Sequence, residues 1–174
     1  TTLNGLNNIR IVEFDVATKT VTAQYLYRMD NPNLGGGDNT RADKIGDAVY
    51  IGNGQFLVVE RDDDAIDSDP LATIEKKVYR FSLDGATNIT GQNAPIDLGG
   101  GVQKSIDQMT AAELASQNIR LVNKALHIDL AKAGYNTVEK VEGLTIIDAN
   151  TVAVLNDNDF GVAGITINNA TGTF

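Results

Sequence analysis

The sequence predicts an all-β protein of antiparallel strands with one inserted helix near residues 111–123. Three observations support this fold class. Short segments alternate apolar and polar residues and are separated by turn residues, which is typical of strands with one buried face. One strand–turn–strand unit occurs twice in the chain. A single segment carries both the start signal and the residue spacing of a helix.

The N-terminal region predicts a β-hairpin. Residues 9–16 (IRIVEFDV) alternate apolar and polar side chains, and residues 20–28 (TVTAQYLYR) do so again after the turn 17–19. Both segments are rich in β-branched and aromatic residues, which favour strands. Residues 30–43 contain an Asn-Pro pair, three glycines and no hydrophobic period, so they predict a loop.

The repeated unit begins at Lys44 and again at Lys140. KIGDAVYIGNGQFLVVERDDD (44–64) aligns without a gap with KVEGLTIIDANTVAVLNDNDF (140–160). Each copy reads as a strand, a short turn, a second strand and a final stretch of acidic or amide side chains. Units that recur in this way predict a repeat array such as a β-propeller, whose blades run roughly 40–50 residues.

We therefore expect the whole chain to form one domain, a partial β-propeller. It divides into a blade part over residues 1–43, a blade over 44–139 that contains the helical insertion, and a blade part over 140–174. This amounts to about three four-stranded blades or parts of blades.

Further strands are predicted on both sides of the insertion. Residues 76–83 (KKVYRFSL), 125–130 (ALHIDL) and 165–167 show strand patterns, whereas residues 88–102 predict a loop. The helix is predicted by Thr110 and Glu113, which have the spacing of a capping box. The apolar residues that follow have roughly helical spacing, so we expect the helix to pack on the outside of the sheet.

Charge and composition exclude several partners. The chain has 14 Lys and Arg against 23 Asp and Glu, giving a net charge of −9. Such a surface repels phosphate backbones, so nucleic acid is not an expected partner. No apolar run approaches the roughly 20 residues of a membrane span. The chain starts at Thr1, which leads us to expect a processed form or a piece of a longer protein.

Oxygen-bearing side chains gather at the end of each repeated unit. A hairpin brings its entry and its exit to the same end, so we expect Glu142 to lie beside residues 156–159. Carboxylates packed together repel one another unless a cation, a proton or solvent relieves them. Calcium takes such carboxylate and amide oxygens as ligands. The predicted metal ligands are Glu142, Asn156, Asp157 and Asp159, with Glu60 and Asp47 from the first copy.

Each of these features has a second interpretation. The acidic stretch 61–69 is typical of a solvated loop as well as of a metal site. Arg61 has the chemistry to clamp a substrate phosphate bidentately, or else to pair with the neighbouring Asp residues. His127, the single histidine, lies among alternating apolar residues and favours a structural role at a strand surface over that of a base or ligand.

The known catalytic patterns are largely missing. The chain has no GxSxG motif and no cysteine, and neither glycine triplet is followed by GK[ST]. A zinc or iron site is disfavoured with one histidine and no cysteine. Hydrolysis would therefore have to be metal-assisted, and no catalytic residue is identified.

Four segments resemble the phytase-like family, described as having esterase-like activity of phytase. They are GQFLVVERDDD (54–64), KVYRFSL (77–83), KALHIDL (124–130) and KVEGLTIIDANTVAVLNDNDF (140–160). The last, with its Glu-Gly-Leu and Asn-Asp-Asn-Asp-Phe elements, is the most specific. The resemblance implies a propeller of exported bacterial proteins, secreted or periplasmic, with acidic loops suited to calcium.

Two function hypotheses remain open, and the resemblance implies only the first. The first is a calcium-dependent ester or phosphoester hydrolase with a small ester or phosphoester substrate. The second is a non-catalytic, calcium-stabilised binding or structural module. Family members are longer than this chain, which implies missing blades and exposed edge strands. We therefore expect the remainder of the propeller, or self-association, to complete the fold.

Overall fold

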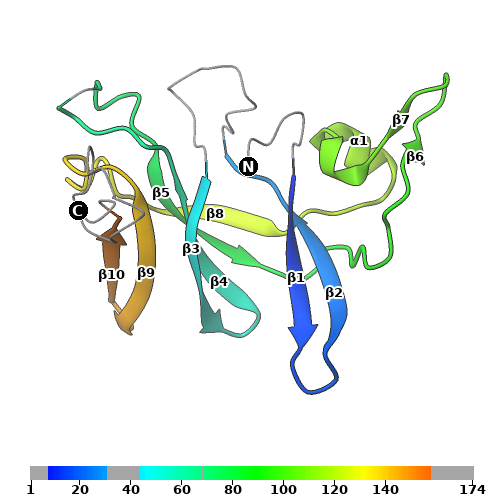
Figure 1. Cartoon of the computed structure of the whole chain (residues 1–174), viewed down its shortest axis with the longest axis horizontal. Helices are drawn as coiled ribbons and strands as arrows, with labels where there is room; N and C mark the ends of the chain where they lie inside the picture. The colour runs from blue at the N-terminus through cyan, green and yellow to red at the C-terminus, as the bar shows by residue number, and fades with distance from the viewer. Residues whose placement is uncertain (1–7, 31–43, 68, 158–174) are drawn as a thin grey trace, which may run out of the picture.

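The computed structural model describes residues 8–30, 44–67 and 69–157. These residues form an all-β protein of small antiparallel sheets (Figure 1). The strands are β1 (Ile9–Asp15), β2 (Thr20–Tyr27), β3 (Lys44–Gly52), β4 (Gln55–Arg61), β5 (Lys76–Ser82), β6 (Ile96–Asp97), β7 (Gln103–Lys104), β8 (Asn123–Asp129), β9 (Val141–Asp148) and β10 (Thr151–Asn156). A 3-10 helix, η1 (Ile106–Gln108), and a short α-helix, α1 (Ala111–Ser116), lie between β7 and β8.

The central element is a four-stranded sheet in the order β3-β4-β5-β8. Each pair of neighbours is antiparallel, and β4 pairs with β5 without a break in register. The middle of β4, residues 56–59, is a continuous apolar run, and the strand is buried from Leu57 to Arg61. Continuous apolar strands of this kind are covered on both faces.

Two hairpins provide that cover. The β1–β2 hairpin contributes Tyr27 to a cluster with Val58 and Phe81, whereas the β9–β10 hairpin contributes Leu144 to a cluster with Leu57. Successive side chains of a strand point to opposite faces, so Leu57 and Val58 meet different hairpins. The predicted N-terminal hairpin is confirmed.

The two copies of the repeated unit adopt the same hairpin in the same register. β3 and β4 pair through Ala48–Val58, Val49–Leu57, Tyr50–Phe56 and Gly52–Gln55. β9 and β10 pair at the aligned positions through Leu144–Val154, Thr145–Ala153, Ile146–Val152 and Asp148–Thr151. The register also shifts next to the turn at the aligned place in both. The predicted repeat is therefore confirmed as a structural repeat.

The insertion between β5 and β8 lies along β2, at the right of Figure 1. The amides of Ile89 and Val122 donate to the carbonyls of Gln24 and Leu26, at 2.8 and 3.0 Å. A third apolar cluster fills the space between the insertion and β2; it consists of Leu26, Ile89, Ile106, Met109 and Leu114. The insertion thus extends the β1–β2 hairpin rather than covering the four-stranded sheet.

The predicted helix is too long. The capping box of Thr110 and Glu113 is confirmed, but α1 ends at Ser116 instead of residue 123. Asn118 adopts a left-handed conformation (φ 56°), which terminates a helix. The following apolar residues run extended so that Val122 reaches β2. The predicted loop 88–102 also needs correction, because Ile96–Asp97 pair with Gln103–Lys104 as β6 and β7.

Some predictions are not tested by this fold. The described residues contain one four-stranded sheet between two hairpins, with no closed barrel, and the propeller remains a prediction. The predicted loop 30–43, apart from Asp30, and the predicted strand 165–167 lie outside the described residues. Among the described helices, none is long and apolar enough to cross a membrane.

Candidate functional site at the end of β4

The candidate site is organised by Glu60 and Arg61, the last two residues of β4. Both are almost completely buried, with exposed fractions of 1% and 2%. A buried charge is costly unless it is paired and hydrogen-bonded. Because the two residues are consecutive on a strand, their side chains leave it toward opposite faces. Each one has at least one partner on a different hairpin, Tyr27 of β2 for Glu60 and Glu142 of β9 for Arg61.

Glu60 is a buried anion surrounded by donors from three other segments. It accepts hydrogen bonds from the Tyr27 hydroxyl, the Asp30 backbone amide at 2.7 Å and the Lys124 ammonium. The Tyr79 hydroxyl donates to Asp30 Oδ2 at 2.7 Å. We call Tyr27, Asp30, Glu60, Tyr79 and Lys124 the Glu60 cluster. It ties β2 to β4, β5 and β8.

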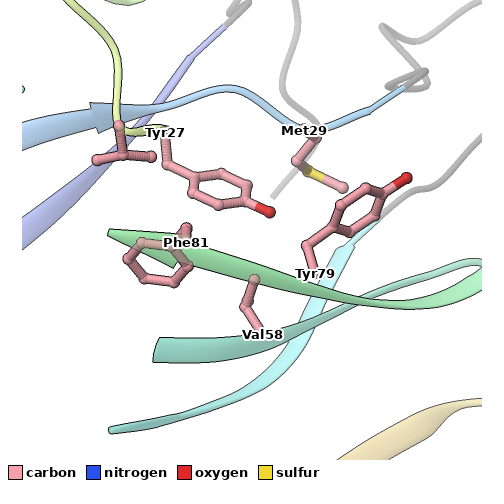
Figure 2. Close-up of a cluster of buried hydrophobic side chains, with 6 residues drawn as sticks. Tyr27, Met29, Val58, Tyr79 and Phe81 are labelled. Carbon is pink, nitrogen blue, oxygen red and sulfur yellow. The ribbon is translucent and has the colours of Figure 1, made fainter. Parts of the chain in front are cut away.

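The tyrosines of this cluster also serve the apolar core. Figure 2 shows the rings of Tyr27 and Tyr79 beside Met29, Phe81 and Val58. The Lys124 ammonium lies 4.1 Å from the centre of the Tyr79 ring and 4.9 Å from that of Tyr27. An ammonium over an aromatic face gains a cation–π attraction, which grows when water is excluded.

Burial shifts the titration of the whole cluster. It raises the pKa of Glu60, although the Lys124 charge and the donated hydrogen bonds oppose that rise. It lowers the pKa of Lys124, against the attraction of Glu60. Burial and the neighbouring carboxylates raise the pKa of Tyr27 and of Tyr79. Perturbed groups that gather beside a pocket are typical of functional sites, although structural ion pairs perturb pKa values too.

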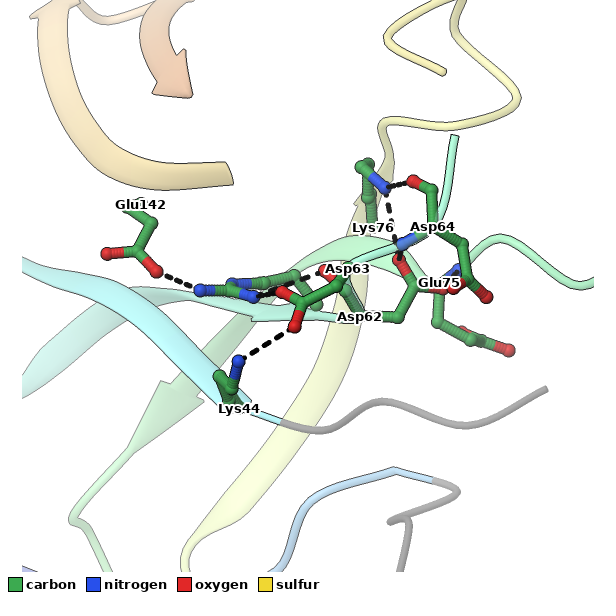
Figure 3. Close-up of polar contacts among 8 residues, drawn as sticks. Lys44, Asp62, Asp63, Asp64, Glu75, Lys76 and Glu142 are labelled. Carbon is green, nitrogen blue, oxygen red and sulfur yellow. Dashed lines mark hydrogen bonds and ion pairs between the residues drawn. The ribbon is translucent and has the colours of Figure 1, made fainter. Parts of the chain in front are cut away.

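Arg61 is the reverse case, a buried cation held by carboxylates (Figure 3). Its guanidinium donates to Asp63 and to Glu142 of β9. Lys44 also pairs with Asp63, at 2.9 Å. The carboxylates are 40% and 42% exposed, in contrast to the arginine. We call Lys44, Arg61, Asp63 and Glu142 the Arg61 cluster. It ties the β9–β10 hairpin to the four-stranded sheet.

A second buried ion pair supports the loop after β4. Lys76 is fully buried and donates to Asp62 Oδ1 at 3.0 Å and to the Asp64 carbonyl. Asp62 also accepts hydrogen bonds from the amides of Asp64 and Glu75. The first half of the predicted acidic stretch is therefore a bonded structure rather than a solvated loop.

The structure brings some of the predicted ligands to one edge. Val141 pairs with Asn156, and the Asp157 amide donates to the Lys140 carbonyl at 2.9 Å, so Glu142 lies on the strand beside Asn156 and Asp157. The Asp47 carboxylate has another partner, because its Oδ2 accepts a hydrogen bond from the Leu144 amide at 2.9 Å. Glu60 lies in its own cluster. Asp159 lies outside the described residues.

The donor set for a metal ion is not complete in the part of the chain that the structure describes. Within it, no three His, Cys, Asp or Glu side chains are arranged to hold an ion. Glu142 and Asp63 share the positive charge of Arg61. The phosphate-clamping role predicted for Arg61 meets the same obstacle, because the guanidinium is buried and already binds two carboxylates.

Sequence reasoning missed the partners of Glu60. Tyr27, Asp30, Tyr79 and Lys124 were assigned only to strands and loops, and they lie far from Glu60 in the sequence. One signal was available. A glutamate at the end of the apolar run LVVER must pair if the strand is buried on both faces.

Comparison with known proteins adds one finding. Neither a curated protein nor a solved structure matches the chain. A family model, phytase-like (esterase-like activity of phytase), matches residues 2–160. That match covers most of the chain, including both hairpins, the central sheet and both clusters. The chain therefore belongs to the phytase-like family.

Proposed function

We propose that this chain is part of a β-propeller that hydrolyses small ester or phosphoester substrates. The observation that carries the proposal is the family match over residues 2–160. The structural repeat supports the propeller, because equivalent hairpins begin at Lys44 and near Lys140. The central sheet supports it as well, since four antiparallel strands between stacked neighbours are the unit of a propeller blade.

The open face of the central sheet fits this architecture. The β9–β10 hairpin packs over β3 and β4, and a pocket of about 550 Å³ remains between its turn and the side chains of Arg80 of β5 and His127 of β8. In the proposed propeller, further strands beyond β10 cover that face. An experimental structure of the longer protein in which strands beyond β10 lie elsewhere would contradict the architecture.

We also propose a calcium ion at the edge where Glu142 lies beside Asn156 and Asp157, with Asp159 as a further ligand. Two of these side chains are carboxylates, Glu142 on β9 and Asp157 directly after β10, which supports a hard cation. Glu142, Asn156 and Asp157 would hold the ion, which would supply Lewis-acid chemistry to an ester or phosphoryl oxygen and to a bound water. The chain's own contribution is to hold Glu142 in place through Arg61.

Activity is tested with p-nitrophenyl acetate and p-nitrophenyl phosphate as substrates. We expect turnover in calcium that is lost on adding a chelator and in Asp157→Asn. The matched control is Glu13→Gln, which changes an exposed carboxylate on β1. No turnover of either ester in a protein that binds calcium would reject the hydrolase proposal.

The second candidate function is a non-catalytic module in which calcium only stabilises the loops. The Arg61 cluster favours it, because the buried guanidinium uses the acidic edge to join two sheets. A calcium titration followed by thermal unfolding separates the two. A rise in melting temperature that is lost in Glu142→Ala, without turnover, would support the module. A calcium response of Glu142→Ala equal to that of the wild type would contradict the proposed ion position.

A further inference from the structure

A pocket opens between the end of β2 and the start of β8. Its volume is about 510 Å³, within the usual range for small-molecule sites. One wall is formed by Arg28, Met29 and Asp30, and the other by residues 121–124. It adjoins the Glu60 cluster, because Asp30 and Lys124 belong to both. Figure 2 shows the neighbouring core, with Met29 beside Tyr79.

Arg28 is the unusual residue of this pocket. Its Nη1 atom is buried and has no hydrogen-bond partner among the described residues; the Arg61 Nε atom is buried in the same way, but the other nitrogens of that guanidinium bind carboxylates. The other arginines of the described residues all have partners for their guanidinium groups: Arg10 binds Asp107, Arg61 binds Glu142, Arg80 binds Gln55 and Arg120 binds the Gly85 carbonyl. A buried donor without an acceptor carries a desolvation cost that a suitable acceptor would remove.

The other two charged side chains of the lining have partners among the described residues, and only one of these partners is an opposite charge. The Lys124 ammonium pairs with Glu60, and Asp30 accepts the hydrogen bond of the Tyr79 hydroxyl. Of the two cations in the described lining of the pocket, Arg28 is therefore the one without an ion-pair partner among the described residues. The chain as a whole has a net charge of −9, so it contains more carboxylates than cationic side chains that could pair with them. The Asn123 side chain adds a neutral amide to the opposite wall.

We propose that this pocket binds a small oxyanion, a carboxylate or a phosphate, through Arg28. A guanidinium presents a planar fork of donors that matches both groups, and a partly desolvated site strengthens such charge-assisted bonds. The proposal does not depend on the hydrolase proposal, because it concerns a different edge of the sheet and requires neither turnover nor calcium.

Asp30 gives the proposal a second, opposite test. Its carboxylate lies on the same wall as Arg28 and repels an incoming anion, so it limits affinity. Replacing it with asparagine removes the charge while leaving an oxygen that can accept from Tyr79. An oxyanion site gains affinity from this change. A cation site loses it.

The experiment is a calorimetric titration of the full chain in chelator, with inorganic phosphate in one arm and acetate in the other, at constant ionic strength. We expect saturable binding in at least one arm, and the arm that binds more tightly identifies the source of the oxyanion. Arg28→Gln should weaken it at least tenfold, and Asp30→Asn should strengthen it. Arg80→Gln is the matched control, because Arg80 is exposed and lies outside this pocket.

Thermal unfolding without ligand distinguishes binding from a structural role. Removing a half-buried cation whose buried Nη1 atom lacks a partner among the described residues should leave the melting temperature unchanged or raise it. A lower melting temperature in Arg28→Gln would make the guanidinium a structural group and overturn the proposal. Equal binding by wild type and Arg28→Gln, or no binding of either anion, would overturn it as well.

Discussion

The Glu60 cluster and the Arg61 cluster are both built around a buried charge at the end of β4, negative in the first and positive in the second. Each joins one hairpin to the central sheet through a side chain that is almost completely buried. In the Glu60 cluster the side chains that donate to the anion are also largely buried: Tyr27 is 1% exposed and Lys124 17%. In the Arg61 cluster the partners of the cation are carboxylates that are 40% and 42% exposed.

This difference in the exposure of the partners determines how much stability is lost when the central residue of each cluster is replaced. A polar group that loses its partner is penalised only to the extent that water fails to replace that partner. The exposed carboxylates around Arg61 rehydrate when the arginine is removed. The donors around Glu60 do not. Two adjacent residues of one strand should therefore differ in their effects on stability.

The largest effect is expected for Glu60→Ala. It leaves Lys124 as a charge without its partner, together with the Tyr27 hydroxyl and the Asp30 amide as donors without an acceptor. Removing one partner of a buried ion pair costs about 3–5 kcal/mol in the free energy of unfolding. Denaturant unfolding measures it. In chelator, Asn156→Ala, at the aligned and exposed position of the second hairpin, should change stability by less than about 0.5 kcal/mol.

A smaller loss is expected for Arg61→Met. Methionine keeps much of the apolar packing, and Glu142 and Asp63 become solvated, so we expect a cost of about 1–3 kcal/mol in the same measurement. Hydrogen exchange should show the loss mainly in the β9–β10 hairpin. A cost equal to that of Glu60→Ala would contradict the proposed role of water.

The two clusters should also differ in the sign of their pH dependence. The raised pKa of Glu60 means that folding favours its protonated form, so its contribution is greatest below the ordinary value of about 4.3 and is lost as the pH rises through the raised pKa. For Asp63, burial alone would raise the pKa, but the Lys44 hydrogen bond and the charge of Arg61 lower it. Its contribution is present above about pH 3.9 and is lost as the pH falls.

The measurement is the free energy of unfolding from about pH 3 to pH 8. Glu60→Gln should remove the loss of stability that occurs as the pH rises. Asp63→Asn should remove the loss of stability that occurs as the pH falls. If both variants flatten the same side of the profile, the contrast between the clusters is wrong.

The smallest effect is expected for Glu142→Gln. Its carboxylate is 42% exposed, and ion pairs of exposed groups contribute about 0–1 kcal/mol. Thermal unfolding in chelator measures this structural share alone, without any calcium. A loss as large as that of Arg61→Met would show that Glu142 is the dominant partner of the arginine.

Local patterns predicted the hairpins well. The alignment of Lys44 with Lys140 anticipated even the pairing of aligned residues, because alternation and the short turns fix the register of a hairpin. The capping box of Thr110 and Glu113 was confirmed for the same reason, since it depends on residues three positions apart.

Long-range pairing was not predictable in this way. Glu60 meets Tyr27 and Lys124 only because two sheets stack and β8 follows a long insertion. The end of α1 was missed because the residues after Asn118 have helical spacing but are drawn into hydrogen bonds with β2. Tertiary contacts decided both outcomes, and neither leaves a short-range mark in the sequence.

The insertion along β2 has a consequence for the behaviour of the chain in concentrated solution. An uncovered strand offers its amides and carbonyls to any other chain, which is a common route to aggregation. Here Ile89 and Val122 occupy the carbonyls of Gln24 and Leu26 on the side of β2 that β1 does not pair with. The inserted segment therefore blocks pairing of the β2 edge with another chain. Shortening it to a tight β5–β8 turn would expose that edge to other molecules.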